Sequence, residues 1–241
     1  MSRATPLIDW PLRAVLFPVL VAQALSVRRT AQILDEPPGP RSGGKKGGLR
    51  LLIIGDSSAA GIGCEHQEQA LSHLLPAHLL PDIPTDWRLI AQTGARTGDV
   101  LDWLDTDPPG PVDIAVTALG VNDVTKLTTR GQWRDRQAAL YDRLGQLGAR
   151  RVYACGLPPV AHFPLLPEPL RWVLGRQAAA FDATLADLCR DHPLARHVPF
   201  EFDMVVEDMS PDGFHPGPGI YAGWARHLAG IIRSDRAAGR I

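Results

Sequence analysis

Short aliphatic runs alternate with longer amphipathic stretches over most of this chain. The clearest run is Leu51–Ile54, four consecutive aliphatic residues that are typical of a strand buried on both faces of a parallel sheet. Further strands are expected near residues 87–91, 112–119, 151–155 and 197–200, and helices at 67–80, from 97 or 99 to 104, at 130–147, around 178–188 and at 218–234. This alternation predicts an α/β fold, a three-layer α/β/α sandwich around a doubly wound parallel sheet.

The first 35 residues fall outside this alternation. They contain the apolar run Ala14–Ala22, which is shorter than the roughly 20 residues needed to cross a bilayer. We expect a helix that lies on the protein or on a membrane surface, in a cytoplasmic and membrane-associated protein. Ala22-Gln23-Ala24 has the small-x-small form of a signal-peptidase site, so export by an N-terminal signal is the alternative, and a membrane anchor is a further one.

Proline and glycine dominate the next segment, residues 36–48. Proline keeps a chain extended and glycine loosens it, so this composition predicts a solvated linker. The linker would join the N-terminal helix (residues 1–35) to a globular domain at residues 49–241.

The overall composition is that of a globular protein, with 45% hydrophobic and 21% charged residues among 241. The formal net charge of −1 argues against nucleic acid as a partner, because polyanion-binding proteins carry a basic excess. The three cysteines, Cys64, Cys155 and Cys189, are too widely spaced for a disulfide framework or a zinc site. We therefore expect no bound metal.

Small and polar residues follow three of the expected strands. Gly55-Asp56-Ser57 follows the first, Gly94 the second, and Gly120-Val121-Asn122-Asp123 the third. Because the carboxyl ends of parallel strands share one edge of a sheet, these residues are expected to meet there. Ser57 is the candidate nucleophile; the alternatives are that this turn only caps a helix, or that Ser58 is the nucleophile.

A serine nucleophile needs a base, and the late turn Asp212-Gly213-Phe214-His215 contains one. His215 can accept the serine proton, and Asp212 can fix the tautomer of the imidazole and stabilise its charged form. Asp203 and Asp208 also precede His215 and are rivals of Asp212 for this role.

The oxyanion that forms during acyl transfer needs hydrogen-bond donors that are in place before the reaction. The backbone N–H groups of Ser57 and Gly94 and the side-chain amide of Asn122 are the candidates. With these blocks in this order, the chain resembles the SGNH hydrolases, also called the GDSL esterase/lipase family, over residues 49–235. The residue after the nucleophile is Ser58 here, where the family name records a leucine.

The resemblance implies a flavodoxin-like SGNH hydrolase fold, with Ser57 as nucleophile, His215 as base, Asp212 as its orienting acid, and Ser57, Gly94 and Asn122 as the oxyanion hole. It implies a serine esterase of the carboxylesterase type that acts on short- to medium-chain or O-acetyl esters of small molecules, without a cofactor. The alternatives are an acyltransferase, a thioesterase or a lysophospholipase with the same site. A non-catalytic nucleotide-binding module is more remote, since residues 55–63 lack a Gly-x-Gly-x-x-Gly fingerprint.

Overall fold

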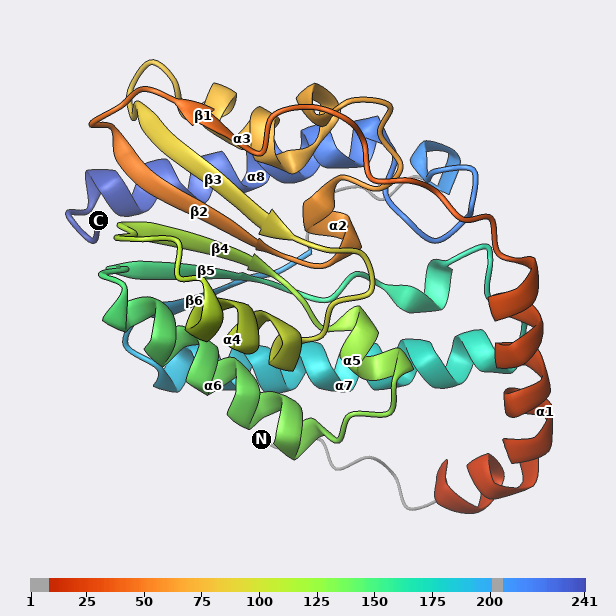
Figure 1. Cartoon of the computed structure of the whole chain (residues 1–241). Helices are drawn as coiled ribbons and strands as arrows, with labels where there is room; N and C mark the ends of the chain where they lie inside the picture. Colours follow the sequence, from red (N-terminus) through yellow and green to blue (C-terminus); the bar gives the residue numbers. More distant parts are fainter. Residues whose placement is uncertain (1–8, 201–205) are drawn as a thin grey trace.

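A computed structural model describes the backbone of residues 9–200 and 206–241 and the side chains of residues 15–200 and 207–241. Its centre is a six-stranded sheet in the order β1-β3-β2-β4-β5-β6 (Figure 1). The strands are β1 (Ser42–Gly44), β2 (Leu49–Gly55), β3 (Thr85–Ala91), β4 (Ile114–Ala118), β5 (Arg151–Cys155) and β6 (Ala195–Val198). All neighbours pair in parallel except β1, which runs antiparallel to β3 at one edge.

Helices cover both faces of the sheet and complete the predicted three-layer α/β/α sandwich (Figure 1). One face carries α2 (Ser57–Ala60), α3 (Leu71–Leu79) and α8 (Pro218–Ala237); the other carries α4 (Thr97–Thr106), α5 (Val121–Thr125), α6 (Arg130–Gln146) and α7 (Leu170–Asp191). Leu51 and Ile53 face the first group, whereas Leu52 and Ile54 face the second. The unbroken aliphatic run is explained by this burial on both sides.

Most element boundaries agree with the sequence, but two predictions were inaccurate. The expected strand at residues 197–200 is β6, two residues earlier. The expected helix at residues 67–80 is a 3₁₀ turn (Gln67–Gln69) followed by α3, because Ala70 between them is extended, with φ −89° and ψ 164°. Gln67 is buried there, and its side-chain amide donates to the Ala60 carbonyl at 2.7 Å. Two further 3₁₀ turns, at Val160–His162 and Val206–Asp208, lie in the late loops.

The segment predicted to be a solvated linker, residues 36–48, is attached to the sheet instead. It contributes β1, and Glu36 accepts hydrogen bonds from the backbone N–H and the hydroxyl of Thr93, at 2.8 and 2.9 Å. Arg41 pairs with Glu36 at 2.9 Å and donates to the Ala91 carbonyl. The backbone groups at the edge of β3 need hydrogen-bond partners. Strand β1 and the side chains of Glu36 and Arg41 supply them, although the composition of this segment favours flexibility.

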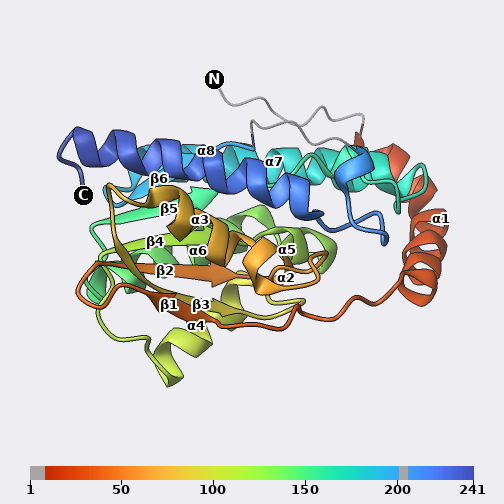
Figure 2. The ribbon, with the colours of Figure 1, turned by 90° about the horizontal axis from the view of Figure 1, so that it is seen from above.

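The N-terminal helix α1 (Asp9–Thr30) stands at the edge of the molecule, beyond the carboxyl ends of the strands, and contacts α7 (Figures 1 and 2). Gln23 links the two helices, since its side chain donates to the Glu168 carbonyl at 2.6 Å and accepts from the Leu170 N–H at 3.1 Å. Among the residues that the structure describes, no helix is both long and apolar enough to cross a bilayer.

Candidate active site

The candidate nucleophile lies where the central strand β2 turns into the short helix α2. Gly55 ends the strand, and only glycine fits there, because a Cβ would lie 2.3 Å from the Ala118 carbonyl oxygen. Asp56 caps α2: its Oδ1 accepts from the Ser58 N–H at 3.0 Å and from the Ser58 hydroxyl at 2.8 Å. The hydroxyl of Ser58 is thus engaged within the turn, whereas Ser57 remains free to meet a group from a later loop.

That group is the imidazole of His215. Its Nε2 lies 2.9 Å from the Ser57 Oγ, and its Nδ1 lies 2.5 Å from Oδ2 of Asp212. An Nδ1–H that donates to the carboxylate leaves Nε2 as the acceptor for the serine hydroxyl, which is the arrangement a general base requires. Of the rival carboxylates, Asp208 packs near Gly219, and Asp203 lies outside the described residues.

The turn between Asp212 and His215 is held by its own hydrogen bonds. Oδ1 of Asp212 accepts from the Ser210 hydroxyl at 2.6 Å and from the N–H groups of Phe214 and His215 at 2.9 and 3.0 Å. The Ser210 N–H in turn donates to the His215 carbonyl at 3.0 Å. Sequence reasoning missed the buried Ser210, because one more serine in a polar turn carries no distinctive signal.

The electrostatics of this turn favour an ionised Asp212. Burial works against the charged form, but hydrogen bonds from the His215 side chain and backbone and from Ser210 outweigh it, so the pKa of Asp212 lies well below its usual range. The carboxylate therefore keeps its charge at neutral pH. A fixed negative charge at Nδ1 stabilises the imidazolium that forms when His215 takes up a proton.

Asn122, one of the candidate oxyanion donors, lines the same cavity as Ser57. It is the second residue of α5, which follows β4 through Gly120 at φ 135°, a conformation that favours glycine. The Asn122 side-chain amide donates to Oδ2 of Asp56 at 3.3 Å. Asp56 is buried, and desolvation raises its pKa.

A buried network fixes α5 to its neighbours. Oδ2 of Asp123 accepts from the N–H and the hydroxyl of Thr97, at 3.1 and 3.0 Å, and Gln137 on α6 donates to the same hydroxyl at 3.0 Å. Burial raises the pKa of Asp123. These bonds tie α4, α5 and α6 together directly behind Asn122.

Gly94, the other candidate donor, lies in the turn after β3 at φ 80°. Its carbonyl accepts from the ammonium group of Lys126 at 2.6 Å, a contact that joins this turn to the end of α5. Gly94 is not among the described residues that line the cavity with Ser57, so its role as a donor stays a prediction. The sequence carried no signal for Lys126.

The cavity beside Ser57 is apolar and small. Its volume is about 60 Å³. Its wall includes Phe163, from the proline-rich loop 157–169, stacked edge-on against Phe214 with ring centroids 5.1 Å apart. The other large apolar lining residues are Leu119, Leu157, Met209, Phe200, Ile220 and Trp224.

A parallel α/β sheet with a serine, a histidine and an aspartate chained at its carboxyl edge defines a hydrolase-type site. Residues 53–222, more than half of the chain, match the model of the GDSL-like lipase/acylhydrolase family. The chain belongs to this family.

A curated relative agrees with this assignment, and solved structures share the fold. The chain is 30% identical over 188 residues to the GDSL-like esterase Rv1075c of Mycobacterium tuberculosis, a match that covers 72% of this chain and 58% of that protein. A candidate SGNH hydrolase from Slackia heliotrinireducens has a similar fold, with a TM-score of 0.58 at 16% identity over 77% of this chain and 99% of the other. The acetylxylan esterase Axe2 from Geobacillus stearothermophilus also has a similar fold, with a TM-score of 0.55 at 15% identity over 75% of this chain and 92% of the other.

Proposed function

We propose that this chain is a carboxylesterase that hydrolyses esters with short acyl groups through an acyl-enzyme on Ser57. The observation that carries the proposal is the continuous hydrogen-bonded chain from the Ser57 Oγ through His215 to Asp212, at 2.9 and 2.5 Å. Each atom pair is within the distance that proton transfer and imidazole orientation require.

In the proposed reaction, the Ser57 Oγ attacks the ester carbonyl while its proton moves to Nε2 of His215. The imidazolium, stabilised by Asp212, then returns this proton to the leaving alcohol, and an acyl-enzyme remains. A water molecule, deprotonated by His215, attacks the acyl carbonyl. Collapse of the second tetrahedral intermediate releases the carboxylic acid and restores the serine.

The oxyanion in both tetrahedral intermediates would be stabilised by the amide of Asn122 and by the backbone N–H groups of Ser57 and Gly94. Asn122 supports this role because it lines the cavity with Ser57 and because Asp56 holds its amide at 3.3 Å. The bonds of Asp123 to Thr97 keep α5 in place behind it, so the donor is oriented before the reaction.

The preference for short acyl groups follows from the size and polarity of the cavity. A cavity of about 60 Å³ favours an acyl chain of a few carbon atoms over a long one. The apolar wall suits a hydrocarbon chain and has few polar groups for a longer polar substituent. The name of Axe2, an acetylxylan esterase, is in keeping with a short acyl group.

The test is hydrolysis of a series of p-nitrophenyl esters from acetate to octanoate. We expect kcat/KM to be highest for acetate or butyrate and to fall with longer chains. Ser57→Ala and His215→Ala should each lower kcat by about a thousandfold or more. A fluorophosphonate should label wild-type Ser57 and not the Ser57→Ala variant, with Ser58→Ala as the matched control that keeps labelling. Wild-type rates in Ser57→Ala would refute the mechanism.

A further inference from the structure

The exposed apolar surface of this protein is concentrated on one element. Among the described side chains, eight large hydrophobic ones are strongly exposed; five of these lie on α1, and a sixth, Ile33, follows it. Phe17 is 63% and Val15 76% exposed. Single exposed apolar side chains are ordinary, but a contiguous group on one helix marks an interaction surface.

The positions of these side chains around α1 show what kind of surface it is. At about 100° per residue, the half-buried Leu16, Leu20, Gln23 and Val27 share one face, which packs toward α7. The exposed Val15, Phe17, Val19, Val21 and Leu25 cover roughly 200° of the remaining circumference. A helix on the surface of a globular protein normally exposes a polar face to water, whereas residues 15–25 of α1 expose an apolar one.

The width of this apolar arc argues against a partner helix or groove. A helix-to-helix seam uses a narrow stripe of positions, and an arc of about 200° would leave part of the apolar surface in water after such docking. A lipid surface has no such limit, because a helix that lies in it is surrounded by acyl chains and headgroups on all sides except the one that packs on the protein.

The charged side chains in the described part of α1 are positive. Arg28 and Arg29 at the end of α1 are exposed, and residues 10–34 contain no Asp or Glu. Arginines at the end of an apolar helix complement anionic headgroups.

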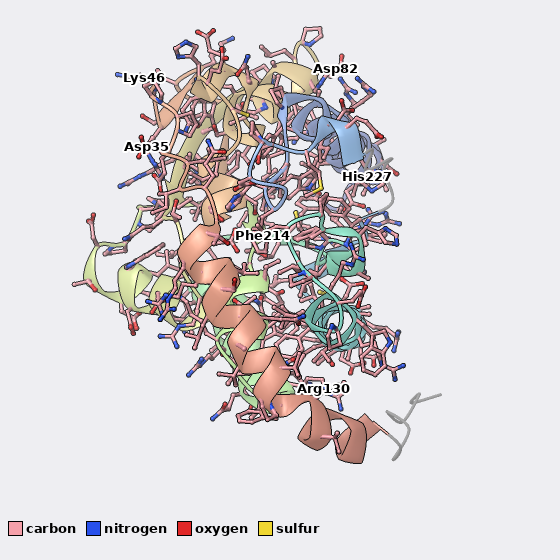
Figure 3. The ribbon with its side chains drawn as sticks, turned by 90° about the vertical axis from the view of Figure 1, so that its right-hand side faces the viewer. Asp35, Lys46, Asp82, Arg130, Phe214 and His227 are labelled. Atoms are coloured by element: carbon pink, nitrogen blue, oxygen red, sulfur yellow. The ribbon has the colours of Figure 1, made fainter. Side chains whose placement is uncertain are left out.

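The site and this helix share one side of the molecule. α1 lies beyond the carboxyl ends of the strands, the edge at which Ser57 and Asn122 lie (Figures 1 and 2). Figure 3 looks onto this side, with α1 in front and the label of Phe214, which lines the cavity, in the same view. Leu127, 80% exposed and at φ 60°, follows α5 at the same edge.

We infer that α1 docks the protein on anionic membranes, with its apolar arc among the acyl chains and headgroups and its arginines on the lipid phosphates. Docked in this way, α1 holds the catalytic edge toward the bilayer. Esters dissolved in or anchored to the lipid surface would then reach the cavity without crossing bulk water. The inference concerns binding alone and does not require the proposed chemistry.

The test is co-sedimentation of the full chain with vesicles of phosphatidylcholine, alone or mixed equally with phosphatidylglycerol. Wild type should bind the mixed vesicles more tightly, and salt should weaken the binding. Phe17→Asp with Val21→Asp should lower the partition coefficient by about tenfold for each side chain withdrawn from lipid. Arg28→Gln with Arg29→Gln should remove most of the preference for anionic vesicles, at about fivefold per arginine.

Leu80→Asp is the matched control, because this exposed leucine precedes β3 and so lies at the opposite edge of the sheet. It should bind vesicles as wild type does. All variants should keep the wild-type circular dichroism spectrum and the same rate on soluble p-nitrophenyl acetate. Absence of vesicle binding by the wild type, or equal loss in Leu80→Asp, would overturn the inference. So would light scattering that shows α1 buried in a dimer which Phe17→Asp dissociates.

Discussion

Replacing Asp212 with asparagine tests the chain of hydrogen bonds at its least obvious link. In the wild type, Oδ1 accepts three hydrogen bonds from Ser210, Phe214 and His215, and Oδ2 faces Nδ1 of His215 at 2.5 Å. An asparagine whose side-chain oxygen occupies the position of Oδ1 retains all three hydrogen bonds. Its NH₂ group then faces Nδ1, so the imidazole must accept there and carry its proton on Nε2.

That tautomer directs an N–H at the Ser57 hydroxyl, and His215 can no longer take the serine proton. The opposite orientation of the amide would set its NH₂ against three donors and leave them unsatisfied, which is costly in a buried turn. We therefore expect kcat to fall by about 10⁴-fold, or about 5 kcal/mol in activation free energy, with a much smaller change in KM. The fold should be retained.

The assay is steady-state hydrolysis of p-nitrophenyl acetate together with the rate of fluorophosphonate labelling of Ser57. Asp182→Asn is the matched control, because Asp182 pairs with His197 at 3.0 Å in a second Asp–His contact that does not involve the nucleophile. This variant should retain activity within about tenfold of the wild type. If Asp212→Asn were equally active while correctly folded, the assignment of Asp212 as the orienting carboxylate would be wrong.

Four further outcomes are expected. Asn122→Ala should lower kcat by about 10²- to 10³-fold with little change in thermal stability, and an unchanged kcat would exclude its amide from the oxyanion hole. Trp224→Leu should enlarge the cavity and raise kcat/KM for hexanoate relative to acetate by roughly fourfold per methylene admitted, at about 0.8 kcal/mol each; a constant ratio would show that the ring does not limit chain length. The folded pKa of Asp212 lies below its unfolded value of about 3.9, so its carboxylate stabilises the fold above the unfolded value and loses this effect as the pH falls from there through the folded pKa. In urea titrations, the stability difference between wild type and Asp212→Asn should therefore shrink from pH 6 to about pH 3, and a constant difference would contradict the pKa shift. Burial raises the pKa of all three cysteine thiols to about 12, so the native protein at pH 8 should not react with a disulfide reagent that attacks all three after denaturation.

The sheet and the candidate site were largely predictable from local patterns. Leu51–Ile54 indicated a strand buried on both faces, and both faces are in fact covered by helices. Parallel strands carry their carboxyl ends to one edge, so Ser57 and Asn122 had to approach each other once the alternation of strands and helices was recognised. The spacing of Asp212 and His215 allowed one turn to hold both, as it does.

Other features depend on contacts between segments far apart in the chain. The Pro/Gly-rich residues 36–48 are attached to β3 because an edge strand needs partners, which composition does not reveal. Lys126 reaches the carbonyl of Gly94 across 32 positions of sequence, and Ser210 supports Asp212 only because the turn closes on itself. The small volume of the cavity likewise results from side chains of several distant elements.

The N-terminal helix shows the same division. The sequence alone was enough to show that the apolar stretch is too short to span a bilayer. It was also enough to identify the turn containing Ser57 and the candidate partners Asp212, His215 and Asn122. Only the tertiary structure decided which face of α1 packs on α7, which apolar side chains stay exposed beside the arginines, and that His215 reaches Ser57 from 158 positions away. Local propensity and spacing act over a few residues, whereas packing and side-chain hydrogen bonds depend on which surfaces the fold brings together.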